Sequence, residues 1–258
     1  MMNIKESLKE QRKNMVIATK RAKQGHLSCC FSVLELLNVL YKNIMNFDKN
    51  NPDSENNDIC ILSKGHAALA LYALFFDMGI LKEETFFSFS KYDSILGEHP
   101  DRNKIPGIQV STGSLGHGLP CGVGMAMAYK AKHKNNKVYV IIGDGEANEG
   151  SNWEAALIAD RYDLDNLVCI IDNNHSESFS PFLREKFKAF GWDNIEIEDG
   201  NDVKLIQEAL QQPHSKPMAI VLNTKKGYGS NLMMSAPETW HHHVPTDEEF
   251  EILMEELS

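Results

Sequence analysis

The sequence predicts a single α/β domain in which a mainly parallel β-sheet is flanked by helices. Segments 138–142 and 167–171 are continuous runs of apolar, largely β-branched residues, as expected for strands buried on both faces. Strand-like segments alternate with segments of helical periodicity, and this order produces parallel sheets with helices on both sides. No Pro-, Gly- or Ser-rich linker divides the chain, so we expect one domain spanning residues 1–258.

The expected elements follow from periodicity and from helix-capping residues. Residues 4–23 predict an amphipathic helix, because their apolar side chains recur on one side. Three further helices are each predicted to begin at a capping box of the form S/T-x-x-E. These boxes are Ser32 with Glu35, Ser151 with Glu154, and Thr246 with Glu249. The other expected helices lie at 67–78, 118–132, 183–190 and 203–211, and the expected strands at 58–62, 138–142, 167–171, 194–197 and 218–222.

Composition and charge argue against several classes of function. The net charge of -10 at pH 7 does not suit a nucleic-acid-binding surface, which requires a basic stripe. No apolar run reaches the roughly 18 residues that a membrane span needs, and the charged residues 1–12 lack the apolar stretch of a secretory signal. The 5 cysteines include no C-x-x-C pair, so neither a zinc site nor a disulfide framework is predicted. The cytoplasm is therefore the expected location.

A carboxylate lies between two glycines where the strand at 138–142 ends, in the sequence Gly143-Asp144-Gly145. Glycines between a buried strand and a helix N-terminus are typical of phosphate-binding turns. The pattern is neither the G-x-G-x-x-G of dinucleotide-binding proteins nor a P-loop. At contact distance Asp144 would repel a bare diphosphate unless a cation such as Mg²⁺ lay between them. Either Asp144 binds such a cation, or it only caps the following helix.

The next strand along the chain ends at Asp172-Asn173-Asn174, and this second loop favours the cation. Loops at the carboxyl ends of parallel strands meet at one crevice, so we expect those beginning at 143, 172 and 223 to be neighbours. The side-chain oxygen of Asn174 would complete the ligands of the cation. Gly-Asp-Gly followed by Asn-Asn in this setting resembles the signature of proteins that bind thiamine diphosphate.

Further motifs resemble the N-terminal domain of transketolases, in the same order and with similar spacing along nearly the whole chain. They are Gly25-His26, Ser63-Lys64-Gly65-His66-Ala67, Gly97-Glu98-His99-Pro100, PGIQVSTGSLG at 106–116, KKGYG at 225–229, Trp240-His241 and PTDEE at 245–249. The resemblance implies the thiamine-diphosphate-binding fold, and within it the domain that binds the diphosphate.

The resemblance also implies roles for individual residues. The cation, Mg²⁺ or alternatively Ca²⁺ or Mn²⁺, would be bound by Asp144, Asn174 and the backbone carbonyl of Ser176. The residues at cofactor-binding positions are His66, Gly113, Ser114, Leu115, Gly145, Glu149, Asn174 and His241, of which Glu149 matches an acid at the interface between cofactor-binding domains. His26, His99 and His241 match histidines that face the reacting carbonyl and hydroxyls of the sugar. Imidazole suits this role because ketol transfer moves protons near pH 7.

Other histidines and the paired cysteines are expected to lie outside the chemistry. His133 and His214 are interpreted as surface or structural residues. His242 and His243 are interpreted as solvated neighbours of His241, because consecutive side chains rarely face one metal ion together. Cys29 and Cys30 are expected to be buried structural residues rather than reactive thiols.

Three stretches depart from the transketolase pattern. The loop at 175–181 is shorter than usual and lacks glycines, residues 27–30 replace a run richer in glycine and serine, and His117 stands where the family often has glutamine. These departures favour an unusual sugar donor or acceptor over the central pentose-phosphate reaction.

In transketolases a following domain supplies the glutamate that hydrogen-bonds to the aminopyrimidine ring of the cofactor. The resemblance therefore implies a second subunit with the pyrimidine-binding and C-terminal domains, in an α2β2 assembly, and transfer of a two-carbon ketol unit between sugars or sugar phosphates. Two alternatives stay open: the alpha-type subunit of another thiamine diphosphate enzyme, and a non-catalytic scaffold that retains the fold. The histidine motifs argue against the first, and the full set of site residues argues against the second.

Overall fold

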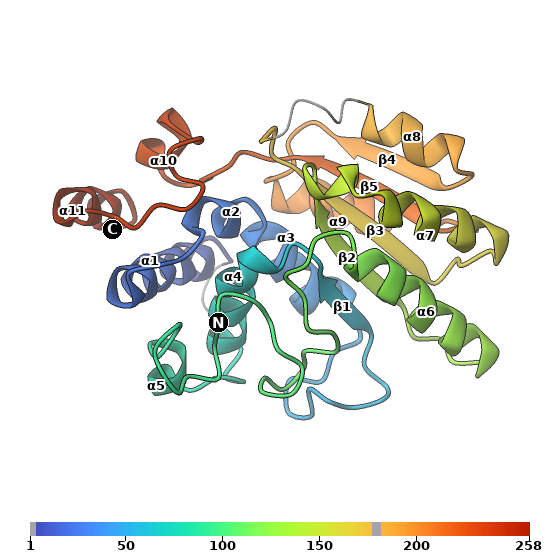
Figure 1. The fold of residues 1–258 in the computed structure, drawn as a ribbon, viewed down its shortest axis with the longest axis horizontal. Coiled ribbons are helices and arrows are strands. Elements are labelled where there is room, and N and C mark those ends of the chain that lie inside the picture. Colours follow the sequence, from blue (N-terminus) through green and yellow to red (C-terminus); the bar gives the residue numbers. More distant parts are fainter. Residues whose placement is uncertain (1–3, 177–181) are drawn as a thin grey trace.

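A computed structural model describes residues 4–176 and 182–258, and five parallel strands form its sheet (Figure 1). The strands are β1 (Ile59–Leu62), β2 (Val138–Gly143), β3 (Leu167–Asn173), β4 (Asp193–Ile197) and β5 (Met218–Asn223). Their order across the sheet is β1-β2-β3-β5-β4, and every neighbouring pair is parallel. The predicted α/β class with a parallel sheet is confirmed.

Helices cover both faces of the sheet (Figure 1). The apolar cluster on one face includes side chains from α1 (Ile4–Ala22), α2 (Leu27–Ser32), α3 (Leu34–Val39), the π-helical turn η1 (Leu40–Ile44), α4 (Ala68–Asp77), α5 (Glu83–Phe86), α9 (Val203–Leu210), α10 (Asn231–Ser235) and α11 (Asp247–Glu256). The cluster on the other face includes side chains from α6 (Gly118–Ala131), α7 (Gly150–Arg161) and α8 (Leu183–Ala189). Two 3₁₀ turns, η2 (Gly65–Ala67) and η3 (Glu146–Asn148), lie at the ends of strands.

The strand residues divide between the two clusters by strict alternation. Along β2, Tyr139 and Ile141 contribute to the first cluster, whereas Val138, Val140 and Ile142 contribute to the second. Successive side chains of a strand point to opposite faces, so a continuous apolar run supplies both cores at once. This is why the central strands are recognisable in the sequence.

Two of the three predicted capping boxes are wrong, because their serines make contacts with other parts of the chain. The hydroxyl of Ser32 donates to the carboxylate of Asp172 at 2.8 Å, and Ser32 ends α2 instead of beginning a helix. The hydroxyl of Ser151 donates to the carbonyl of Gly116 at 2.6 Å, inside α7.

The third box is confirmed. The side chain of Thr246 accepts from the backbone of Glu249, and the Glu249 side chain accepts from the backbone of Thr246, at the start of α11.

The three loops expected to form the crevice do meet at one edge of the sheet. Gly143 is in register with Asp172, and Asn173 with Asn223. Immediately beyond, the N–H of Asp144 donates to the carbonyl of Asp172 at 3.2 Å. The polar residues that follow β2, β3 and β5 are therefore neighbours.

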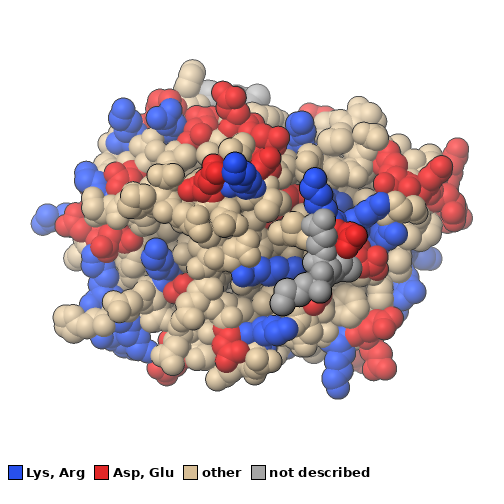
Figure 2. Space-filling model, turned by 180° about the vertical axis from the view of Figure 1, so that it is seen from behind, with Lys and Arg blue, Asp and Glu red and all other residues tan. Residues whose placement is uncertain are grey.

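The surface of the described residues carries charges of both signs. On the face seen in Figure 2, acidic and basic side chains are interspersed among uncharged ones. Among the helices within 4–176 and 182–258, none has both the length and the apolar character that crossing a membrane requires.

Candidate functional site

The two side chains predicted to bind the cation lie at the ends of adjacent strands. Asp144 follows β2 and is 3% exposed, and its Oδ1 accepts from the N–H of Gly145 at 2.9 Å. Asn174 follows β3, and its Nδ2 donates to Oδ2 of Asp172 at 3.0 Å. That hydrogen bond fixes the amide so that Oδ1 points away from Asp172, as a ligand oxygen must.

The structure does not support a purely capping role for Asp144. The residues that precede η3 and α7 are Gly145 and Glu149, and neither helix has a side-chain cap. A buried carboxylate at a strand end is then better explained by binding to a cation.

Ser176, the third predicted ligand, lies directly beside Asn174. Its N–H donates to Oδ1 of Asn174 at 3.2 Å, and its hydroxyl donates to the same oxygen. The remainder of the shortened loop, residues 177–181, lies outside the described residues.

A buried ion pair beneath these ligands connects three segments of the chain. The ammonium of Lys64 donates to the carboxylate of Asp172, and both side chains are 1% exposed. Burial disfavours both charges, but their attraction outweighs it, so the pKa of Lys64 is raised and that of Asp172 is lowered. Asp172 also accepts from the hydroxyls of Ser32 and Thr224, which ties α2 and the end of β5 to the cation ligands.

A second buried acid, Glu146, joins the loops around the site. Its Oε1 accepts from the N–H of Gly116 at 2.9 Å and from the hydroxyl of Ser63, and its Oε2 accepts from the N–H of Gly143 at 3.2 Å. Burial raises the pKa of Glu146 against the effect of these hydrogen bonds. One side chain thus sets the positions of the segments after β1 and β2 and the loop before α6.

The loop predicted to line the cofactor packs tightly on its neighbours. A Cβ at Gly65 would lie 2.8 Å from the backbone nitrogen of Gly113, and a Cβ at Gly113 would lie 2.9 Å from the ring of His99. Glycine is needed where backbones approach this closely. Ser114 and Leu115 follow on the same loop and are exposed.

The predicted interface acid, Glu149, lies beside the same loop. Gly116 has a φ of +80°, and a Cβ there would lie 2.5 Å from the Cβ of Glu149. Glu149 is itself exposed. Its position agrees with the expected contact to another domain.

Three of the histidines predicted to bind the cofactor or face the sugar come together from separate segments. The ring centroids of His26 and His66 are 5.3 Å apart, those of His26 and His241 are 5.6 Å apart, and those of His66 and His241 are 6.1 Å apart. His99 lies close enough to lower the pKa values of His26 and His66. The sequence therefore placed these residues correctly in one cluster.

The cluster holds its imidazoles in the neutral form. Burial, assisted by neighbouring histidines and lysines, lowers the pKa of His26 from 6.5 to about 4. Burial and the nearby charge of Lys64 lower the pKa of His66 to about 2. A neutral imidazole both donates and accepts a hydrogen bond, as binding a sugar hydroxyl or carbonyl requires.

His241 connects this cluster to the cation ligands. Its Nδ1 lies 3.0 Å from the ammonium of Lys226 and 3.9 Å from Sγ of Cys29. A cavity of about 200 Å³ is lined by Asn174, Ser176, Lys226 and His241, with His175, Pro237 and Glu238. A predicted cofactor-binding histidine and two predicted cation ligands thus share one cavity.

A larger cavity of about 860 Å³ lies among α1, α3 and α9, and no predicted site residue lines it. Size alone does not identify a functional site, so we place the chemistry at the strand ends, where the polar groups converge.

Residues that the sequence analysis left without a role support the site from below and beside it. Lys64 and Asp172 form the buried pair, Glu146 joins the loops, and Lys226 contacts His241. Lys64 stands within a recognised motif and Asp172 at a predicted strand end, and these positions were the available signals.

The expectations for the cysteines and the remaining histidines are partly met. Cys29 and Cys30 are buried, and burial raises the pKa of Cys30 to about 12, as expected for a structural thiol. His133 is exposed, and His214 is half-buried with its Nδ1 2.8 Å from a backbone carbonyl. The interpretation of His243 as a solvated neighbour is wrong, because its Nε2 lies 2.8 Å from Glu249 and its ring lies edge-on to a tryptophan.

Comparisons with known proteins agree with this site. The family described as "Transketolase, thiamine diphosphate binding domain" matches residues 4–254. An apulose-4-phosphate transketolase subunit of Actinobacillus succinogenes is 39% identical over 258 residues, which cover 96% of this chain and 92% of that protein. The 6-deoxy-6-sulfo-D-fructose transketolase subunit SqwG of a Clostridium species is 37% identical over 219 residues, covering 81% of this chain and 79% of that protein.

Among solved structures, transketolase from Leishmania mexicana superposes with a TM-score of 0.89 and 25% identity. The match covers 100% of this chain but only 41% of that enzyme. The family, the thiamine-diphosphate-binding fold and the resemblance to subunits of split transketolases are confirmed. This chain belongs to the transketolase family, as its thiamine diphosphate binding domain.

Proposed function

We propose that the whole chain, residues 1–258, acts as the diphosphate-binding subunit of a two-chain transketolase-like enzyme that transfers a two-carbon ketol unit from a ketose to an aldose. The observation that carries this proposal is the buried Asp144 beside Asn174, within one edge of the sheet that also holds the cluster of His26, His66 and His241. Relatives of similar length are named as transketolase subunits, which supports the two-chain arrangement.

The donor set fits a hard divalent cation that bridges the protein and a diphosphate. Asp144 offers a carboxylate oxygen and Asn174 an amide oxygen, and the carbonyl of Ser176 would be the third ligand. Mg²⁺ binds through one or two protein carboxylates or similar oxygens together with phosphate oxygens, and Ca²⁺ or Mn²⁺ would accept the same groups. A bare carboxylate would repel the diphosphate, so the cation is required for binding.

The diphosphate would be held by Gly145, His66 and His241, with the turn at 113–115 lining the cofactor. Lys226 adds a positive charge to the same cavity, next to His241. This charge favours an anionic group there, as the diphosphate end of the cofactor would be.

Bound thiamine diphosphate supplies the electron sink that cleavage of a carbon–carbon bond beside a carbonyl demands. The chain's own histidines then bind and orient the sugar. His26 and His99 donate to and accept from its hydroxyls and carbonyl, and His241 moves protons on the same side. The low pKa values of His26 and His66 keep these imidazoles neutral, so substrate binding does not require loss of a proton.

The second subunit would supply the pyrimidine-binding and C-terminal domains, including the glutamate that activates the cofactor. The exposed Glu149 and the segment 107–119 beside it form the surface on which we place this partner. An α2β2 assembly follows if each pair of subunits repeats the arrangement of cofactor-binding domains. The 5 cysteines are all free thiols, which supports a reducing compartment such as the cytoplasm.

The test is a coupled assay of the reconstituted pair against a panel of ketose donors and aldose acceptors, phosphorylated and unphosphorylated. We expect ketol transfer with at least one donor–acceptor pair, and none when the chain carries Asp144→Ala. Asp165→Ala, an exposed acid before β3, is the matched control and should retain activity. Absence of ketol transfer across the panel by a correctly assembled pair would refute the proposed reaction.

A further inference from the structure

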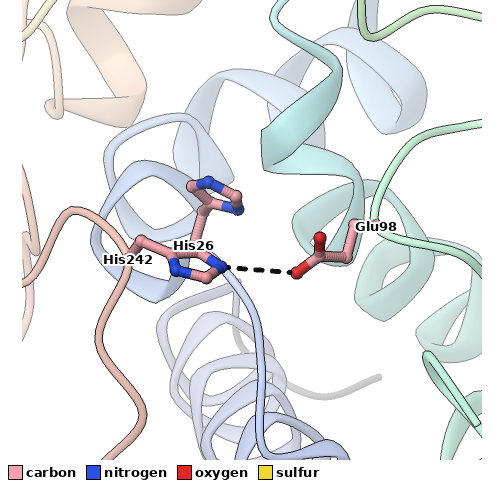
Figure 3. A group of neighbouring side chains, drawn as sticks. All are labelled: His26, Glu98 and His242. Atoms are coloured by element: carbon pink, nitrogen blue, oxygen red, sulfur yellow. Dashed lines mark ion pairs between the residues drawn. The ribbon is translucent and has the colours of Figure 1, made fainter.

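Three potential metal ligands from distant segments converge beside the histidine cluster. They are His26 before α2, Glu98 in the loop between α5 and α6, and His242 after α10 (Figure 3). One ligand atom of each lies within 4.8 Å of the others. The ring centroids of His26 and His242 are 4.6 Å apart, and Nε2 of His242 lies 3.7 Å from Oε1 of Glu98. His242 is therefore part of a cluster and is not merely a solvated neighbour of His241.

Two atoms of this cluster have unused hydrogen-bonding capacity. Nδ1 of His26 and Oε1 of Glu98 are buried and have no hydrogen-bond partner among the described residues. A buried polar atom without a partner costs free energy, so most such atoms in native proteins are satisfied. Both are good ligand atoms, and their unsatisfied state is the independent observation that points to a bound group.

We infer that His26, Glu98 and His242 form a binding site for a transition-metal cation of the zinc type. Two imidazoles and one carboxylate are the protein ligands of many zinc sites that keep a fourth position open. Imidazole nitrogen favours Zn²⁺, Ni²⁺ or Cu²⁺ over Mg²⁺, so this site differs in kind from the all-oxygen set of Asp144 and Asn174.

The distances permit binding after small side-chain rotations. With metal–ligand bonds of about 2.0–2.1 Å, the ligand atoms of a tetrahedral site lie roughly 3.4 Å apart. The 3.7 Å between His242 and Glu98 is already close to this value. The side chain of His242 is 56% exposed and can rotate without displacing the core.

The surrounding charges do not prevent binding of a cation. The carboxylate of Glu98 lies within the cluster, and burial with the influence of its neighbours keeps His26 neutral, with a free lone pair. Of the two nearby lysines, Lys64 is paired with Asp172, and Lys226 contacts His241.

The functional consequence rests on the proposed function, whereas the binding site does not. His26 is expected to bind the sugar, and a metal ion bound to its nitrogen would withdraw that group from the substrate. Zn²⁺ at this site therefore inhibits ketol transfer and competes with the sugar.

The test uses Co²⁺ as a spectroscopic probe with the purified full-length chain, without thiamine diphosphate. Excess Mg²⁺ is present to occupy the oxygen ligands Asp144 and Asn174. We expect one equivalent of Co²⁺ to produce saturable visible absorption that Zn²⁺ removes. Glu98→Gln and His242→Asn should each weaken binding by at least roughly 10–100-fold, the loss that follows even from removal of an outer-shell partner.

His133→Asn is the matched control, because it replaces an exposed histidine outside the cluster and asparagine tolerates the positive φ of 52° there. It should bind Co²⁺ like the wild type, and circular dichroism should show that all three variants are folded. Absence of saturable binding would overturn the proposal. Equal affinity in both cluster variants would overturn it too, as would thiolate-to-metal absorption, which would place the ion on a cysteine.

Inhibition is then measured in the assembled enzyme. Zn²⁺ should inhibit the wild type at least tenfold more strongly than the His242→Asn enzyme, in proportion to the affinities. If the assembled enzyme catalyses no ketol transfer although the chain binds Co²⁺ as described, the proposed function fails and the metal site stands.

Discussion

Asp172 is the residue on which the geometry of the site depends most. Its carboxylate is buried, pairs with Lys64, and orients the amide of Asn174 through a hydrogen bond of 3.0 Å. Removing one partner of such a pair leaves a buried charge uncompensated, which is usually strongly destabilising. The cation ligands are thus positioned by a group that does not itself need to touch the cofactor.

At the same scale, Asp144→Ala should abolish binding of thiamine diphosphate by the assembled enzyme at ordinary Mg²⁺ concentrations. The physical reason is that the cation loses its carboxylate ligand, and the diphosphate then has no bridge to the protein. Isothermal titration calorimetry measures this directly, with Asp165→Ala as the surface control. Wild-type affinity in Asp144→Ala, or an affinity that EDTA does not change, would disprove the assignment.

The histidines should separate into two groups by their kinetics. His26→Ala and His99→Ala should lower turnover by roughly 10²–10⁴-fold and leave cofactor affinity near that of the wild type, because these side chains act on the sugar. His66→Ala should instead weaken cofactor affinity. Steady-state kinetics and cofactor titrations distinguish the two, and His133→Asn is the exposed control. Turnover near wild type in both His26→Ala and His99→Ala would contradict their roles.

At the scale of elements, the site depends on loops that pass each other with no space for side chains. Gly116 adopts a φ of +80° against Glu149, and Glu146 accepts from its N–H at 2.9 Å. The loop before α6 and the turn after β2 are thereby fixed to one another. A change in either loop would displace the cofactor turn at 113–115.

The matched pair Gly116→Ala and Gly124→Ala tests this packing. Gly116→Ala should lower the free energy of unfolding by about 1–3 kcal/mol and weaken cofactor binding, because the new Cβ overlaps Glu149 and the backbone is strained. Gly124 lies in α6, and a Cβ there meets nothing within 4 Å. Gly124→Ala should therefore stabilise by up to about 1 kcal/mol through helix propensity. Urea unfolding compares them, and equal effects would contradict the account.

The elements were predictable where burial follows a simple period and less so where serines make long-range contacts. The strands and most helices follow from apolar runs that supply two cores. The capping boxes at Ser32 and Ser151 failed because their hydroxyls donate to Asp172 and Gly116, which the local sequence cannot reveal. The Thr246 side chain instead accepts from the backbone of its own helix, so its box forms.

The same reasoning explains what was predicted of the site. Asp144 and Asn174 follow recognisable strands, and parallel strand ends must meet, so their proximity follows from the topology. Lys64 and Glu146 could not be placed, because in a sequence a charged residue normally indicates solvent exposure. The convergence of Glu98 with His242 was also hidden, since it depends on the paths of two long loops.

At the scale of the whole molecule, the buried histidines make stability depend on pH. The unfolded chain binds protons on these imidazoles near pH 6.5, whereas the folded chain does so near pH 4 for His26 and pH 2 for His66. Below pH 6.5 the unfolded state therefore binds more protons, and stability falls as pH falls. Each such histidine contributes a slope of at most about 1.4 kcal/mol per pH unit.

Urea unfolding of the isolated chain between pH 7 and about pH 4 should show this decline. His66→Asn should reduce the slope, because one proton-binding difference between the two states is removed. His133→Asn, at an exposed position, should leave the slope as in the wild type. An identical slope in His66→Asn would show that this histidine is not buried in the neutral form.

The whole chain presents the diphosphate-binding half of an active site, and its partner must enclose the other half of the cofactor. The chain matches only 41% of a complete transketolase, with a TM-score of 0.89 over that part. An interface that completes an active site should be large and apolar at its centre. The account therefore makes activity a property of the assembly.

Sedimentation of the chain alone and mixed with its partner, paired with a coupled ketol-transfer assay on each sample, tests this central claim most directly. We predict no activity for the chain alone, and activity that appears together with a larger α2β2 species on mixing. Both halves of the cofactor must be held before the thiazolium ring is positioned for reaction. Robust ketol transfer by this chain alone would contradict the account.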